Sequence, residues 1–116
     1  MITDSAFIAA ADATLATIGL ALDAALETGD ADVDWSLNDG ILEIDCGDGG
    51  KLIVNRHVAN RELWVAAKAG GFHFRPQEGR WRDTRGGDEI EPVLAKLLKA
   101  QAGLAVKLPP LAAPTL

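Results

Sequence analysis

Hydrophobic residues recur with two different periods along this chain, and the order of those periods is the strongest constraint on its fold. Near the N-terminus the apolar positions repeat at helical spacing: Phe7, Ala11, Leu15, Ile18, Leu22 and Leu26. Thr3 can cap this helix and Gly29 ends it. Beyond Gly29, apolar and polar residues alternate, as in β-strands with one buried face. The pattern predicts a long helix followed by strands.

Turn signals divide the middle of the chain into five or six strands. The sequence Asn38-Asp39-Gly40 joins the first two, because it favours a tight hairpin. The "GDGG" at 47–50 marks the next turn. The strands that follow are predicted at "KLIVNR" (51–56), "RELWVAA" (61–67), "GFHFR" (71–75) and the short "GRWRD" (79–83).

A second amphipathic helix follows the strands. Asp88 and Glu91 resemble a capping box, and Pro92 falls in the first turn, where it is tolerated. We expect an α+β two-layer sandwich, in which two roughly parallel helices cover one face of a five- to six-stranded antiparallel sheet. Residues 1–106 would form the single domain. Residues 107–116 would form a proline-rich tail, either lying across the groove between the helices or disordered.

Charge is distributed unevenly along the chain. Residues 1–50 contain eleven acidic residues and no lysine or arginine, whereas residues 51–116 contain eleven basic residues and six acidic ones. The two parts have formal charges of −11 and +5. An acidic face of this kind favours cations or a basic protein surface over nucleic acid. The N-terminus lacks the pattern of a signal peptide or membrane span, so we expect a soluble, unexported protein.

Few residues of this chain suit catalysis. The sequence has no phosphate-binding loop, no Gly-x-Ser-x-Gly elbow and no histidines at metal-ligand spacing. His57 and His73 are expected to be separate surface or edge residues, His57 just past a strand end. The one cysteine, Cys46, is expected to be a buried structural thiol. The sequence therefore favours a protein that is not an enzyme.

A dense set of carboxylates lies around the end of the first helix and the first strand: Asp23, Glu27, Asp30, Asp32 and Asp34. Carboxylate oxygens are the ligands that hard cations prefer. Without histidine or cysteine, such a site would bind metal weakly and with little selectivity. The alternative is a solvated acidic face that keeps the protein soluble.

Trp64 is predicted on the polar face of its strand, together with Glu62 and Lys68. A tryptophan there is either half covered by neighbouring side chains or held out for a partner.

Several motifs resemble the frataxin family, in its bacterial CyaY branch. They are "IVNR" at 53–56, "LWVA" and "GGFHF" within 63–74, and Trp81 in a short strand after a loop. The resemblance extends from Asp4 to about Val106. It implies the helix–sheet–helix fold already predicted from periodicity. It also implies an iron-binding accessory protein of iron-sulfur cluster assembly that regulates the cysteine desulfurase and scaffold complex.

The resemblance also assigns roles to residues. Asp23, Glu27, Asp30, Asp32 and Asp34 correspond to the acidic ridge at which family members bind ferrous or ferric iron weakly, with other divalent cations as further ligands. Asn55, Arg56 and Trp64 match outward-facing positions that contact the assembly machinery, so Trp64 is expected to be an interface anchor. The implied protein is bacterial and cytoplasmic, a monomer when metal-free, and binds neither nucleic acid nor membrane.

This chain departs from the family in the middle of the first helix. Many relatives have consecutive acids there, whereas this chain has Gly19 and Leu20. We therefore expect fewer or weaker iron sites than in a typical relative. Two other functions stay open: an iron store or ferroxidase, for which the chain lacks a Glu-x-x-His pair, and a metal-independent protein-binding module.

Overall fold

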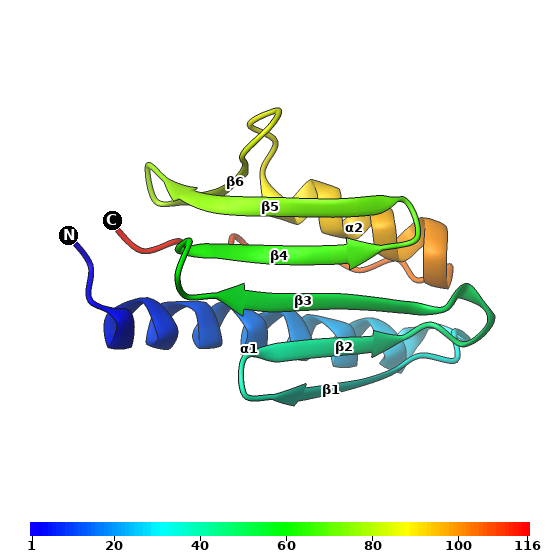
Figure 1. Ribbon diagram of the computed structural model, residues 1–116. Coiled ribbons are helices and arrows are strands. Elements are labelled where there is room, and N and C mark those ends of the chain that lie inside the picture. Colours follow the sequence, from blue (N-terminus) through cyan, green and yellow to red (C-terminus); the bar gives the residue numbers. More distant parts are fainter.

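The structure, a computed structural model, describes all residues 1–116. Its helices are α1 (Asp4–Thr28) and α2 (Ile90–Ala102), with a short 3₁₀ turn η1 (Gly47–Gly49) between strands. The strands are β1 (Asp34–Asn38), β2 (Ile41–Asp45), β3 (Lys51–His57), β4 (Glu62–Ala67), β5 (Gly70–Gln77) and β6 (Arg80–Asp83). They form one antiparallel sheet in chain order, and both helices lie on the same side of it (Figure 1). The predicted two-layer α+β architecture is confirmed.

The α1 helix begins and ends where the sequence predicted. The hydroxyl of Thr3 accepts a hydrogen bond from the amide of Ala6 at 3.2 Å, and Gly29 follows the last helical residue. Its apolar stripe from Phe7 to Leu22 is buried against the sheet. By length and apolar composition alone, α1 would also suffice for a membrane span. Core helices commonly meet that criterion, and here the stripe is part of the core.

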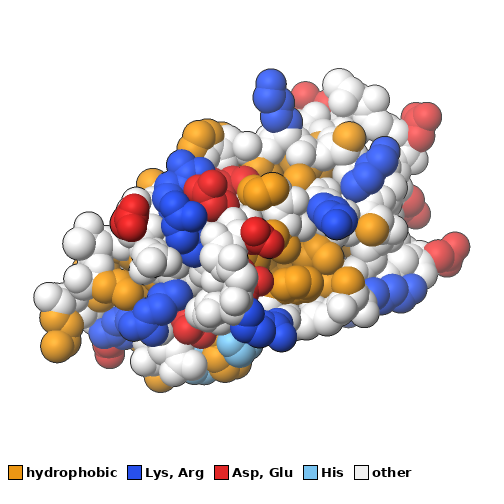
Figure 2. All heavy atoms as spheres, turned by 90° about the horizontal axis from the view of Figure 1, so that it is seen from above, with side chains coloured by type: hydrophobic (Ala, Val, Ile, Leu, Met, Phe, Trp, Pro, Cys, Tyr) orange, Lys and Arg blue, Asp and Glu red, His pale blue; other side chains and the backbone are white.

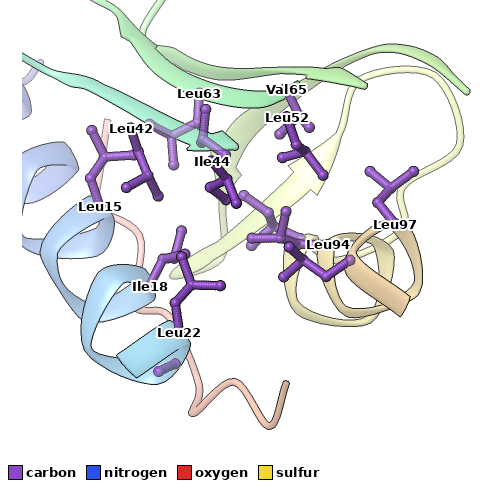
Figure 3. Close-up of a cluster of buried hydrophobic side chains, with 14 of the residues drawn as sticks. Leu15, Ile18, Leu22, Leu42, Ile44, Leu52, Leu63, Val65, Leu94 and Leu97 are labelled. Atoms are coloured by element: carbon purple, nitrogen blue, oxygen red, sulfur yellow. The ribbon is translucent and has the colours of Figure 1, made fainter. Parts of the chain in front are cut away.

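The core lies between the sheet and the two helices. Side chains from α1, the inner face of the strands and α2 point toward one another in Figure 3, among them Ile18, Leu63 and Leu94, all fully buried. The turn between β1 and β2 sets how these two strands pair. Its residues Asp39 and Gly40 have φ values of 47° and 76°. These positive values are those of a type I′ turn, whose twist matches that of antiparallel strands.

The predicted capping box of α2 is wrong. The N-cap is Glu89, whose side chain makes no capping hydrogen bond. Glu91 instead accepts hydrogen bonds through Oε2 from the amide of Leu111, at 2.8 Å, and from Arg80, at 3.3 Å. The side chain of Glu91 can bind these groups because the C-terminal segment and β6 both pass beside the first turn of α2.

The C-terminal segment packs on the helical side of the domain. Leu104, Val106 and Leu111 are buried, and Ala112 makes an isolated bridge to Arg80. The amide of Ala113 donates to the carbonyl of Gly79 at 2.9 Å. The segment thus packs against the domain, and the assignment of residues 107–116 as a separate tail stays a prediction.

Candidate functional site

The five carboxylates predicted as metal ligands lie at one end of the molecule, on the last turns of α1, the following loop and the start of β1. Asp23, Glu27, Asp30, Asp32 and Asp34 are all exposed. None of them lies within 4.0 Å of a lysine, arginine or histidine nitrogen, whereas acids elsewhere, such as Asp12 and Glu43, form ion pairs. This acidic end therefore keeps its negative charge free for solvent, cations or a partner.

Asp23 has one internal partner. The indole Nε1 of Trp35 donates a hydrogen bond to Oδ1 of Asp23 at 2.8 Å. The rotamer of Asp23 is thereby held against β1, and one of its oxygens is already in use.

The structure brings no three of these acids together. No group of three or more histidine, cysteine, aspartate or glutamate side chains is placed to hold a metal ion. Separate, exposed carboxylates suit hard cations by their chemistry, but they offer single contacts and retain their hydration. The acidic end therefore fits weak, water-mediated cation binding, and the ligand set stays a prediction.

The second candidate surface is the face of the sheet that carries no helix. Asn55 on β3 and Trp64 on β4 are cross-strand partners on this open face, as expected. Ile41 on β2, directly opposite Asn55, is 49% exposed. The open face thus presents one exposed isoleucine beside its polar groups.

Trp64 is held in place on three sides. Its ring stacks on His57 with centroids 3.8 Å apart and on His73 with centroids 4.4 Å apart, and both pairs of rings are nearly parallel. Its Nε1 donates to Oε1 of Glu62 at 2.8 Å. Both faces of the indole are covered, so a partner can meet only its edge. Of the two predicted situations, Trp64 is the half-covered one, and its role as an anchor stays a prediction.

Arg56 does not share the open face, which corrects the expectation that it faces outward with Asn55 and Trp64. The alternation of strand side chains turns it toward α1, where Nη1 pairs with Asp12. Its Nη2 lies 3.2 Å from Asp39, and its side chain is only 15% exposed. Arg56 thus ties α1 to β3 and to the β1–β2 turn.

The stack contains residues that the sequence interpretation missed. His57 is the last residue of β3, not a residue beyond it, and Glu62 is 7% exposed although it lies on the open face. The strand register could have revealed the stack, since His73 is the direct partner of Trp64 on β5. Alternation along one strand gives the face of a residue, but only the register across strands gives its neighbours.

Comparison with known proteins identifies one family. Residues 1–104 match the model of the frataxin-like domain. The chain is 51% identical over 106 residues to a protein of Dechloromonas aromatica, covering 90% of this chain and 97% of the relative. It is 42% identical over 107 residues to a protein of Cupriavidus metallidurans, covering 92% and 96%. Both relatives are called iron-sulfur cluster assembly protein CyaY.

Solved structures give the same result. A frataxin from Psychromonas ingrahamii superposes with a TM-score of 0.73 at 30% identity, covering 91% of this chain and 97% of that one. A trimeric yeast frataxin complexed with ferrous iron has a TM-score of 0.72 at 21% identity, covering 81% and 86%, and shows a shared fold.

Proposed function

This chain belongs to the frataxin-like family, and we propose that it is an accessory protein of iron-sulfur cluster assembly, with no catalytic step of its own. The observation that carries this proposal is the acidic end formed by Asp23, Glu27, Asp30, Asp32 and Asp34. All five carboxylates are exposed, and none is neutralised within the chain. Such a surface does not stabilise the fold, because unpaired like charges in proximity destabilise the folded protein.

Iron is the cation that the family suggests, and the carboxylates would bind it as a weakly held cargo. Hard oxygen donors suit ferrous and ferric ions as well as other divalent cations. With no converging set of three ligands, each site would rely on one or two carboxylates and water. The hydrogen bond from Trp35 to Asp23 further lowers the number of free oxygens. We therefore propose fewer and weaker iron sites than in relatives with acids in the middle of the first helix.

The protein partners would be the cysteine desulfurase and the scaffold protein. The acidic end suits a basic patch on one partner, and the open face with Asn55 and Trp64 suits a less charged surface on another. Arg56 would support this surface from beneath rather than contact the partner. We place the protein in the bacterial cytoplasm, as a monomer in the absence of metal.

Cluster assembly kinetics test this function. The purified chain is added to desulfurase and scaffold, and cluster formation is followed at several iron concentrations and ionic strengths. We expect the chain to change the assembly rate, and this change to become smaller as ionic strength rises. Salt screens the charges of the acidic end, with a Debye length of about 8 Å at physiological ionic strength. An assembly rate that is the same with and without the chain would overturn the proposal.

A matched pair of variants tests the acidic end itself. Replacing Asp30 and Asp32 by asparagine removes two charges there, and replacing Glu78 and Asp88 by their amides removes two exposed charges elsewhere. We expect the first variant to lose desulfurase binding and iron binding, and the second to retain both.

One alternative has a specific observation in its favour. Because no three ligands converge, the acidic end could serve a protein partner alone, which would make the chain a metal-independent binding module. In that case the D30N/D32N variant loses desulfurase binding, while the wild-type chain shows no saturable uptake of ferrous iron in an anaerobic titration.

A further inference from the structure

Two arginines lie directly opposite each other on the open face of β5 and β6. The strand register pairs Arg75 with Arg82. The residues on either side of them, Phe74, Pro76 and Trp81, point into the core, so both arginines point away from it. Directly opposed residues on one face have Cβ atoms about 4.5–5.5 Å apart, and like charges at that spacing repel. The free protein therefore contains a destabilising pair of positive charges.

Acidic side chains of this chain compensate the pair only in part. The nearest is Glu62, whose Oε2 lies 3.9 Å from Nη1 of Arg75. Oε1 of Glu62 already accepts the indole hydrogen bond of Trp64. Nη1 of Arg75 also donates a hydrogen bond to the carbonyl of Asn60 at 3.2 Å. Arg82 has no carboxylate within 4.0 Å, and its side chain makes one hydrogen bond, a long one of 3.5 Å to the carbonyl of Gly87. Most N–H donors of the two guanidinium groups are therefore free.

A hollow of about 370 Å³ lies at this pair, and charged and polar side chains make up most of its lining. Besides the two arginines, Gln77 and Thr84 contribute polar side chains to it, and Pro76 and Asp83 complete it. Oδ1 of Asp83 accepts from the amide of Arg85 at 2.8 Å. Figure 2 views the molecule from the side of β5 and β6 and shows lysine and arginine side chains at several places over this edge.

We propose that the hollow between Arg75 and Arg82 is a binding site for a single oxyanion, a phosphate or a carboxylate group. Guanidinium groups present planar pairs of N–H donors that match both anions. Gln77 and Thr84 add neutral donors at the rim. A bound anion removes the repulsion between the arginines. A long polyanion is disfavoured, because the chain has a net charge of −6 and eleven acids in its first 50 residues.

Two probes distinguish the source of the anion. The ¹⁵N-labelled full chain is titrated with inorganic phosphate and, separately, with acetyl-Ala-Glu-Ala-amide, with sodium chloride keeping the ionic strength constant. We expect saturable shifts confined to β5, β6 and the loop after β6. Saturation by phosphate alone assigns the site to a free phosphate group, and saturation by the peptide assigns it to a carboxylate on a protein. If neither probe saturates, the proposal is overturned.

A matched pair of charge variants distinguishes a specific anion-binding site from nonspecific electrostatic attraction. Arg82→Gln removes one guanidinium from the hollow, and Lys99→Gln removes the same charge from the exposed side of α2. We expect at least a tenfold loss of affinity in the first variant, the size of one lost charge-assisted hydrogen bond, and no change in the second. Equal affinity in the two variants would contradict the proposal. Their unshifted core resonances would confirm that both variants fold.

Discussion

The indole ring of Trp35 lies against the backbone of Gly19. A β-carbon added at Gly19 would come 2.6 Å from Cη2 of Trp35, closer than packed carbon atoms can approach. The same indole donates its N–H to Asp23 one turn further along α1. This packing is a structural reason for a glycine at position 19: the ring of Trp35 occupies the space that a side chain would need.

The first prediction concerns this pair. In a helix, glycine to alanine normally stabilises by about 1 kcal/mol. We expect Gly19→Ala to destabilise the native protein by about 1 kcal/mol instead, because Trp35 must move and lose its bond to Asp23. In a Trp35→Ala background the same change should stabilise. Urea unfolding of the four proteins in this cycle measures both signs, and an equal effect of Gly19→Ala in both backgrounds would contradict the packing argument.

The second prediction concerns Trp64. An interface anchor held out for a partner would contribute little to stability. With the stack on His57 and His73 and the bond to Glu62 in view, we expect Trp64→Ala to cost about 1–2 kcal/mol of unfolding free energy. Trp64→Phe keeps an aromatic ring between the histidines but loses the indole donor, so it should cost less. Denaturation of the two variants checks this order, and binding to the scaffold can be measured on the same samples.

Arg56 gives a third prediction. Because it pairs with Asp12 and Asp39 and is largely covered, Arg56→Ala should lower stability by about 1–3 kcal/mol. Once allowance is made for the unfolded fraction, its binding to the assembly machinery should be nearly unchanged. A stable variant with impaired binding would instead return Arg56 to the partner surface.

The C-terminal segment gives a fourth. Leu111 is 2% exposed, and its amide is bound by Glu91. We expect Leu111→Ala to cost about 2–3 kcal/mol, and removal of residues 107–116 to cost at least as much. Thermal unfolding measures both. If the truncated chain melts at the wild-type temperature, residues 1–106 form the complete domain and the tail is dispensable.

Cys46 gives a fifth. Burial, and secondarily the charge of Asp45, raise its pKa above the ordinary value of 9.0. The unfolded chain therefore loses the thiol proton at a lower pH than the folded one, so this residue leaves stability unchanged below pH 9 and lowers it as pH rises further. We expect iodoacetamide at pH 8 to react at least tenfold more slowly with native than with urea-unfolded protein. Similar rates would mean an accessible thiol.

Periodicity predicted the helices and strands of this fold because burial of apolar area dominates folding. The spacing of hydrophobic residues along the chain shows which face of each element is buried. Each local pattern specifies one local feature: the stripe of α1 its buried face, the Asn38–Gly40 sequence a hairpin, and the alternation along β4 the two faces of that strand. The capping box at Asp88 and Glu91 failed because a nearby amide from the C-terminal segment competed successfully for the carboxylate of Glu91.

The sequence by itself determined the order of elements, the inner and outer faces of the strands, and the concentration of acids in the first 50 residues. Only the tertiary structure decided which of these groups meet: His57 and His73 on either side of Trp64, Trp35 over Gly19, and Arg75 opposite Arg82. The physical reason is the separation in sequence between the residues that interact. Local patterns fix backbone conformation through neighbours a few residues away, whereas contacts across strands depend on register and packing between residues distant in the chain.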